Sequence, residues 1–186
     1  MLMKKLSILK QLSVALLIAM LGITLVGCDD NDGVTKKDND KEKNENVEEN
    51  KELTFGLDET AVFPNLEITA LEIKKSEGDE YFKPDEGNVN VGVKISIKNI
   101  SDKTEHISSV LLFDAYVDDK KQEFSFVIDD AFSGGTLDGE LEAGKMMEGW
   151  YTMELPTDAK TLDLVIKDNW LSKNKAKFTF DLTKVD

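Results

Sequence analysis

The feature that most constrains the fold is an alternation of apolar and polar residues from Val89 to Ile97. Valine or isoleucine occupies every odd position of this segment, and a polar residue or glycine occupies every even one. Successive side chains of a β-strand point to opposite faces, so the pattern predicts a strand with one buried face. The chain must therefore build a sheet and cover one side of it.

Shorter runs with the same period of two recur through the C-terminal part of the chain. They lie at residues 66–73, 110–117, 123–128, 147–155, 162–166 and 176–182. Long apolar stripes of helical period are missing after the N-terminal segment, so the βαβ alternation of a parallel sheet is not indicated. Residues 53–186 are predicted to form one all-β domain, an antiparallel β-sandwich of about seven strands, with a closed barrel as the alternative.

Turn residues separate the predicted strands. Polar residues at 99–103 follow the longest run, and the acidic and lysine residues at 118–121 suit a tight hairpin. Gly144 offers a positive φ for a third turn, whereas Gly149 inside a strand predicts a bulge or a close backbone approach. Pro156 cannot donate to a ladder and should end its strand.

The first 28 residues carry the features of a bacterial lipoprotein signal. Three lysines precede residues 12–26, an uncharged stretch of 15 residues. As a helix it would span about 22 Å, less than the hydrocarbon core of a bilayer, which favours export over permanent spanning.

The stretch ends in Leu-Val-Gly-Cys at residues 25–28, which resembles the lipobox. In that motif the cysteine receives a diacylglycerol and becomes the new N-terminus. We therefore predict a signal peptide over 1–27 and lipidation of Cys28, which would attach the protein to the extracytoplasmic face of a membrane through two acyl chains. The alternative is a chance thiol after an ordinary signal peptide or a short anchor.

The next segment differs sharply in composition. Residues 29–52 hold ten acidic residues, five lysines and five asparagines, with two valines as the only large apolar groups. Such a segment buries too little apolar surface to offset the entropy of ordering, so residues 28–52 are predicted to be a disordered linker. A flexible chain of this length has an end-to-end distance of about 25–30 Å, enough to lift a domain away from lipid headgroups.

Composition excludes several function classes. All 23 basic residues are lysine, 37 residues are acidic, and the net charge is −14. A chain with this balance lacks the electropositive stripe that nucleic acids require. One cysteine and one histidine leave too few ligands for a zinc site. A single cysteine also cannot form an internal disulfide. No cofactor is predicted.

Catalytic signatures are weak. His106 lies near Ser101, Ser108 and Ser109, but no Gly-x-Ser-x-Gly motif accompanies it, so we interpret it as a surface histidine. Carboxylates are the only abundant metal ligands, and calcium prefers such oxygen atoms. The candidate calcium ligands lie in the acidic loop 129–140 and are Asp129, Asp130, Asp138 and Glu140. The alternative is that these charges serve solubility.

Two tryptophans are candidates for recognition. If Tyr151 faces the core, strand alternation points Trp150 outward, where it either binds a partner or is covered by a loop. Trp170 lies between the last two strands and is predicted to plug one end of the sandwich.

Two blocks of sequence resemble a known family. Residues 93–102 (VKISIKNISD) are similar to its strand followed by a Lys-Asn-x-Ser/Gly-Asp turn, and 135–145 (GTLDGELEAGK) with 149–156 (GWYTMELP) are similar to its second block. The family comprises bacterial lipoproteins with an immunoglobulin-like domain of unknown function and is similar to a mycobacterial secreted immunoprotective antigen. The resemblance implies an immunoglobulin-like sandwich over about residues 53–182 and supplies no catalytic residues.

We therefore expect a membrane-tethered, non-enzymatic lipoprotein that binds an extracytoplasmic protein through a loop end or a free sheet edge. The alternative is a domain that binds calcium or a small ligand through the acidic loop. An envelope hydrolase that uses His106 is the third hypothesis.

Overall fold

A computed structural model describes residues 33–37, 53–122 and 127–186, all within the unit that spans residues 32–186. The predicted signal peptide 1–27 and the lipidation candidate Cys28 lie outside the described residues. Within the described part, no helix is long and apolar enough to cross a membrane.

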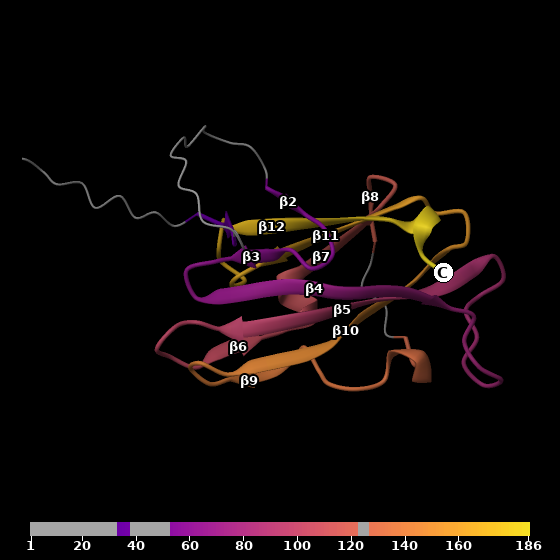
Figure 1. Cartoon of the computed structure of the whole chain (residues 1–186). Coiled ribbons are helices and arrows are strands. Elements are labelled where there is room, and N and C mark those ends of the chain that lie inside the picture. Colours follow the sequence, from indigo (N-terminus) through magenta and orange to yellow (C-terminus); the bar gives the residue numbers. More distant parts are fainter. Residues whose placement is uncertain (1–32, 38–52, 123–126) are drawn as a thin grey trace, which may run out of the picture. The chain divides into compact units, whose positions relative to one another are not determined.

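Two five-stranded sheets form a β-sandwich (Figure 1). In spatial order, the first sheet contains β1 (Thr35–Lys36), β3 (Thr60–Val62), β4 (Leu66–Ser76), β5 (Asn88–Asn99) and β10 (Met146–Pro156). The second contains β2 (Thr54–Phe55), β12 (Lys175–Asp181), β11 (Thr161–Lys167), β7 (Phe113–Val117) and β8 (Lys120–Lys121). All neighbours are antiparallel except β2 and β12.

Short elements complete the described part. They are the strand pair β6 (Glu105–Ile107) and β9 (Gly139–Leu141), the helix α2 (Ser109–Leu112), and the 3-10 turns η1 (Asp130–Phe132) and η2 (Leu182–Lys184).

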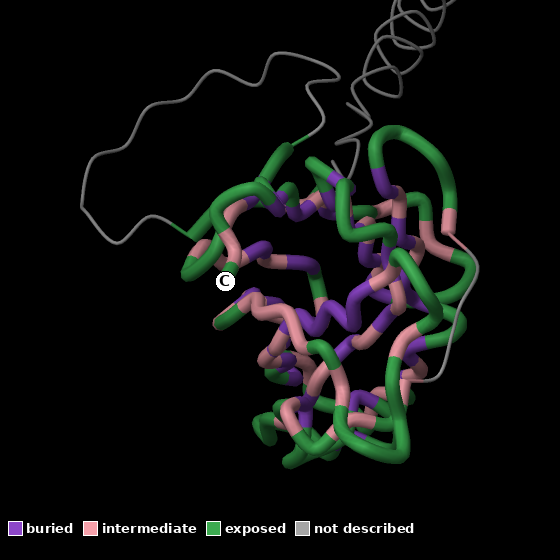
Figure 2. The backbone as a smooth tube through the Cα atoms, turned by 90° about the vertical axis from the view of Figure 1, so that its right-hand side faces the viewer, coloured by how far each residue is buried: buried purple, intermediate pink, exposed green. Residues whose placement is uncertain are grey.

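The core lies between the two sheets, as the alternation in the sequence requires. Every odd residue of β5 from Val89 to Ile97 is buried, and β11 and β12 bury alternate residues in the same way. Phe113 of the second sheet stacks on Tyr151 of the first, with ring centroids 5.1 Å apart. Figure 2 shows buried residues along the strands and exposed residues at the turns. The predicted all-β sandwich is confirmed.

The predicted strands agree with the structure where the alternation was strong. The runs at 66–73, 89–97, 147–155, 162–166 and 176–182 correspond to β4, β5, β10, β11 and β12. The described residues contain twelve strands, against about seven predicted, because strands of two or three residues are too short to show a period.

Two predicted strands differ from the structure. Residues 110–112 belong to α2, and the strand starts at Phe113. The Asp138 carboxylate accepts hydrogen bonds from the Ser109 amide and hydroxyl, at 2.8 and 2.9 Å, and so holds the first turn of α2. Residues 127–128 are not in a strand, and residues 123–126 lie outside the described residues.

The predicted turns are present. Asp118 and Asp119 both have positive φ, 46° and 66°, as a two-residue hairpin between β7 and β8 requires. Gly144 has φ 72° in the turn before β10, and β10 ends at Pro156.

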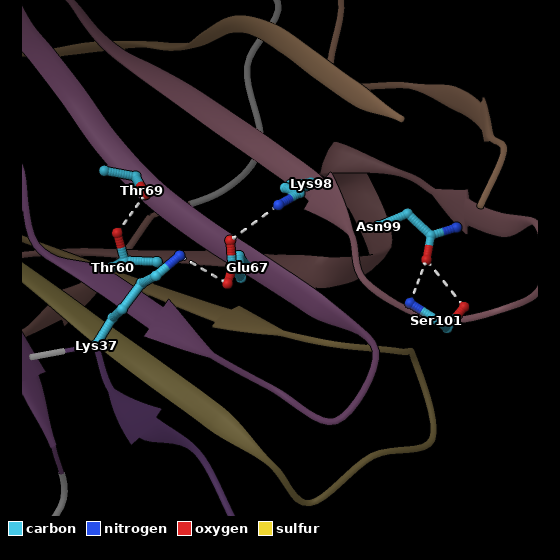
Figure 3. Close-up of polar contacts among 7 residues, drawn as sticks. All are labelled: Lys37, Thr60, Glu67, Thr69, Lys98, Asn99 and Ser101. Carbon is cyan, nitrogen blue, oxygen red and sulfur yellow. Dashed lines mark hydrogen bonds and ion pairs between the residues drawn. The ribbon is translucent and has the colours of Figure 1, made fainter. Parts of the chain in front are cut away.

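Part of the predicted disordered linker is ordered. Residues 35–36 form β1, which pairs with Ala61 and Val62 of β3. The Lys37 side chain donates to Glu67 of β4 at 2.8 Å, and this hydrogen bond lowers the pKa of Glu67 (Figure 3). Val34 packs against the core. The prediction averaged the composition of a charged segment and so missed the two residues of β1, which add a strand to the edge of the sheet.

Asn99, at the end of β5, joins this strand to β9 and to the turns at 100–104 and 142–145. Its side chain is fully buried, and the amide donates to the Lys103 and Leu141 carbonyls at 2.6 and 2.8 Å. Its side-chain oxygen accepts from the amide and hydroxyl of Ser101, both at 2.9 Å (Figure 3). The backbone of Asn99 bonds to the 144–145 turn. The Lys-Asn-x-Ser turn is therefore a hydrogen-bonded junction.

We predict that Asn99→Ala lowers the free energy of unfolding by at least about 2 kcal/mol, because it leaves buried backbone groups without partners. Lys103→Ala is the matched control, since its exposed side chain lies in the same turn. Urea unfolding of both variants measures the effect. Equal stability of the two variants would show that Asn99 is not the junction.

Candidate functional site

The four candidate calcium ligands do not converge. Asp129 accepts from the Asn90 side-chain amide and the Ala131 backbone amide, whereas Asp138 accepts from Ser109. Glu140 lies across from His106, 3.9 Å away and exposed. Asp130 is exposed on η1. In the part of the chain that the structure describes, no three His, Cys, Asp or Glu residues form a group that could hold a metal ion.

Asp129 has a structural role in this loop. Burial acts to raise the pKa of Asp129, but hydrogen bonds from Ser76, Asn90 and the Ala131 amide outweigh burial and lower it. The carboxylate therefore remains ionised and fixes the loop to β5. A cation would have to displace these protein donors from the Asp129 carboxylate.

Most of the acidic loop belongs to a strap, residues 127–138, over the outer face of the first sheet. Phe132 packs against Trp150 with ring centroids 5.4 Å apart. A Cβ at Gly92 of β5 would lie 2.4 Å from the Phe132 ring, so glycine is required beneath it. Further along, a Cβ at Gly149 would lie 2.7 Å from the Thr136 backbone, which confirms the predicted close approach.

This strap partly covers Trp150. Its ring contacts Phe132 and the Lys74 ammonium, which is 4.5 Å from the Trp150 centroid and 5.7 Å from the Phe132 centroid. Trp150 is half-buried and partly covered by the strap, and its role in binding stays a prediction. The prediction that Trp170 plugs the sandwich is wrong, because its side chain is 68% exposed.

The residues weighed for hydrolysis have other contacts. The hydroxyl of Ser101 donates to Asn99 and that of Ser109 to Asp138, while His106 faces Glu140 on the surface. Burial, with a smaller contribution from Asp114, raises the pKa of Tyr151 to about 12, so its phenol stays protonated at neutral pH. None of these contacts is the serine and histidine pair that nucleophilic catalysis uses.

Two adjacent exposed aromatic residues lie in the aromatic turn, residues 79–83, between β4 and β5. Tyr81 is 82% exposed and Phe82 is 48% exposed. Asp79 fixes the turn by accepting hydrogen bonds from the amides of Tyr81 and Phe82, at 2.7 and 2.8 Å. Gly78, with φ 73°, lies so close to the Phe82 carbonyl that a side chain would not fit. Both rings are thus presented by a preformed backbone.

A shallow hollow adjoins this turn. Its volume is about 260 Å³, and its lining includes Tyr81, Phe82, Lys83, Asn90, Val127, Ile128 and Glu154. Glu154 of β10 accepts from the Asp85 amide and the Asn88 side chain, at 2.9 and 2.8 Å, which fixes the loop to the sheet. Pockets for small ligands are usually larger, roughly 300–1,000 Å³. This hollow is smaller than that range.

Sequence reasoning missed the aromatic turn. Tyr81 and Phe82 are adjacent, so one of them breaks any period of two, and they lie among acidic residues with Pro84 and Gly87 close by. An aromatic pair in a loop rich in turn residues is the signal that could have identified it.

We predict that Gly92→Ala displaces Phe132 and costs about 1–3 kcal/mol of unfolding free energy, because the new methyl group overpacks the strap. In a Trp170→Phe background, Trp150 emission should shift to the red. Gly56→Ala is the control, since its Cβ would meet only Glu59, at 3.9 Å.

A double variant tests this contact. Gly92→Ala with Phe132→Ala should lose less stability than the sum of the single variants, because removing the ring removes the clash. Additive losses would contradict the packing of Phe132 on Gly92.

Comparison with known proteins relates the fold to solved structures. A protein classed as a lipoprotein from Staphylococcus aureus superposes with a TM-score of 0.51 at 19% identity, over 68% of this chain and 90% of that one. An uncharacterised β-sandwich protein from Clostridium difficile gives 0.50 at 19% identity, over 74% of this chain and all of the other. These likenesses concern the fold.

YcdA of Bacillus subtilis, also classed as a lipoprotein, gives a TM-score of 0.51 at 15% identity over 63% of this chain. The present chain spans only 36% of YcdA. No curated protein matches the chain. The similarity to the mycobacterial antigen stays a prediction.

The family described as "Domain of unknown function (DUF4352)" matches residues 55–177. This range begins in β2 and ends in β12, and so it includes most of both five-stranded sheets, the aromatic turn and the strap. The chain therefore belongs to the DUF4352 family.

Proposed function

We propose that the protein is a lipoprotein anchored through Cys28 on the extracytoplasmic face of a membrane, and that its sandwich is a non-enzymatic module that binds a protein partner. The observation that carries this proposal is the aromatic turn, which is preformed, highly exposed and placed beside a hollow. Exposed tyrosine and other aromatic side chains are typical anchors of protein interfaces.

The anchor rests on the N-terminal sequence. Cys28 is the only cysteine and follows Leu25, Val26 and Gly27 in the order that a lipobox has. The fold neighbours from S. aureus and B. subtilis are both classed as lipoproteins, which supports the same assignment here. Residues 1–27 would be removed, and Cys28 would carry the lipid.

The position of the aromatic turn suits a tethered module. The turn joins the end of β4 to the start of β5, whereas β1, which follows the anchor, begins beside the start of β4. The turn thus lies at the end of the sandwich away from the point where the chain from Cys28 joins it (Figure 1). A partner outside the membrane would meet this end first.

A non-enzymatic role agrees with the contacts of the polar residues. Tyr81 and Phe82 supply apolar contact area with hydrogen-bonding capacity at one phenol, and Lys83 and Glu154 add charges at the rim of the hollow. This composition is that of a recognition surface, in which apolar anchors are surrounded by polar groups.

We predict that a photo-crosslinking amino acid at position 81 of the full-length lipoprotein yields a discrete crosslinked species in cells that make the protein. The matched control places the same group at Leu57, which is exposed but not in the hollow. Identical products at both positions, or none at position 81, would contradict the proposed binding surface.

The same cells test the anchor when they are fed an alkyne analogue of palmitate. The wild-type protein should be labelled and Cys28→Ser should not, because the thiol is the only site that can take the diacylglycerol. Unlabelled wild-type protein would overturn the anchor, whatever the crosslinking result.

A further inference from the structure

The part of the chain nearest Cys28 joins one defined end of the sandwich. β1 begins at Thr35, which pairs with Val62 at the end of β3, beside the start of β4. β2 begins there too, because it runs parallel to β12 from the start of that strand. The Lys75 amide, at the far end of β4, donates to the Asp186 carbonyl, so β4 and β12 start at the same end.

We call this end proximal. It comprises the turns at 63–65, 100–104, 142–145 and 168–174, with α2 at the start of β7. The Asn99 junction ties the 100–104 and 142–145 turns together. α2 belongs to the same end because Phe113, which follows it, pairs with Ile166 at the end of β11.

Exposed apolar side chains are concentrated at the proximal end. Trp170 and Leu171, at the tip of the turn between β11 and β12, are 68% and 72% exposed. The remaining exposed large apolar residues of this end are Leu53, Ile100, Val110, Leu111 and Met146. At the opposite, distal end the exposed apolar residues are those around the aromatic turn. The proximal end thus offers several apolar side chains on separate loops.

Charge also differs between the two ends. The proximal turns carry exposed Lys103, Lys145 and Lys173 against exposed Asp102 and Glu142. The distal loop 77–87 is acidic, and its acidic residues are Glu77, Asp79, Glu80, Asp85 and Glu86, against one lysine. The proximal turns are therefore less acidic than the distal loop 77–87.

The distance between the anchor and this end is short. Cys28 precedes Gly33, the first described residue, by five positions. Five residues span at most about 18 Å when fully extended. β1 is held in the sheet, so the chain between Cys28 and the sandwich is shorter than the predicted linker 28–52. The proximal end therefore stays closer to a lipid on Cys28 than that linker would allow.

We propose that the proximal end docks on the surface of an anionic phospholipid membrane, with Trp170 and Leu171 at the headgroup level. Tryptophan favours that interface, and lysines near the surface are attracted to anionic lipids by about 1 kcal/mol each. The proposal rests on the proposed anchor at Cys28. It makes the sandwich stand end-on, with the aromatic turn directed away from the lipid.

The single cysteine allows a direct test. The mature chain, residues 28–186, is coupled through Cys28 to a maleimide-headgroup lipid in vesicles of phosphatidylcholine and phosphatidylglycerol, with brominated acyl chains as quencher. We expect tryptophan emission to fall and to shift to the blue. Trp170→Phe should abolish the quenching, because the remaining Trp150 lies under the strap on the outer face of the first sheet.

Two further variants locate the contact. Leu171→Ser should weaken the quenching, whereas Tyr81→Ser, at the distal end, should leave it unchanged. All three substituted side chains are exposed, so the variants should keep the fold. Equal quenching in vesicles of phosphatidylcholine alone would overturn the role given to the lysines.

Unquenched Trp170 on coupled protein would overturn the docking. Protection of Trp170 from acrylamide without quenching by bromine would also overturn it, because a second copy or another protein would then cover this end. Chemical coupling replaces cellular acylation in this experiment. A failure of docking is therefore distinct from a failure of the palmitate labelling, which tests the anchor.

Discussion

The structure depends on the burial of β5 at the centre of the first sheet. Its odd residues enter the core, and at its start Asn90 and Gly92 on the other face are buried as well, because the strap lies over them. Its last residue, Asn99, closes the hydrogen-bonded junction of the proximal turns. One strand therefore positions the core, the strap and one end of the sandwich.

The sequence predicts those parts of the structure in which burial leaves a pattern along neighbouring residues. The alternation in β4, β5, β10, β11 and β12 is a direct record of one buried face, so these strands and the sandwich could be predicted. The cover over Trp150 could not, because Phe132 reaches it from a loop with no period. The acidic residues of that loop were candidate calcium ligands, yet Asp129 and Asp138 accept hydrogen bonds from distant segments.

The two ends of the sandwich have different chemistry. The proximal end receives the chain from Cys28 and bears lysines and exposed apolar side chains, while the distal end bears the acidic loop with Tyr81 and Phe82. Such a division is useful to a tethered protein, since one end can meet the lipid and the other a partner. β1 makes the arrangement specific, because pairing with β3 ties the segment that follows Cys28 to the proximal end.

The height of each end of the sandwich above the membrane tests the end-on orientation most directly. Fluorophores placed at position 81 or at position 102, an exposed residue of the proximal turn 100–104, transfer energy from the lipid-coupled chain to acceptor lipids with an efficiency that falls with distance. β4 alone has eleven residues, and a strand of that length spans about 35 Å. We predict efficient transfer from position 102 and weak transfer from position 81. Equal transfer from both positions would contradict an end-on sandwich.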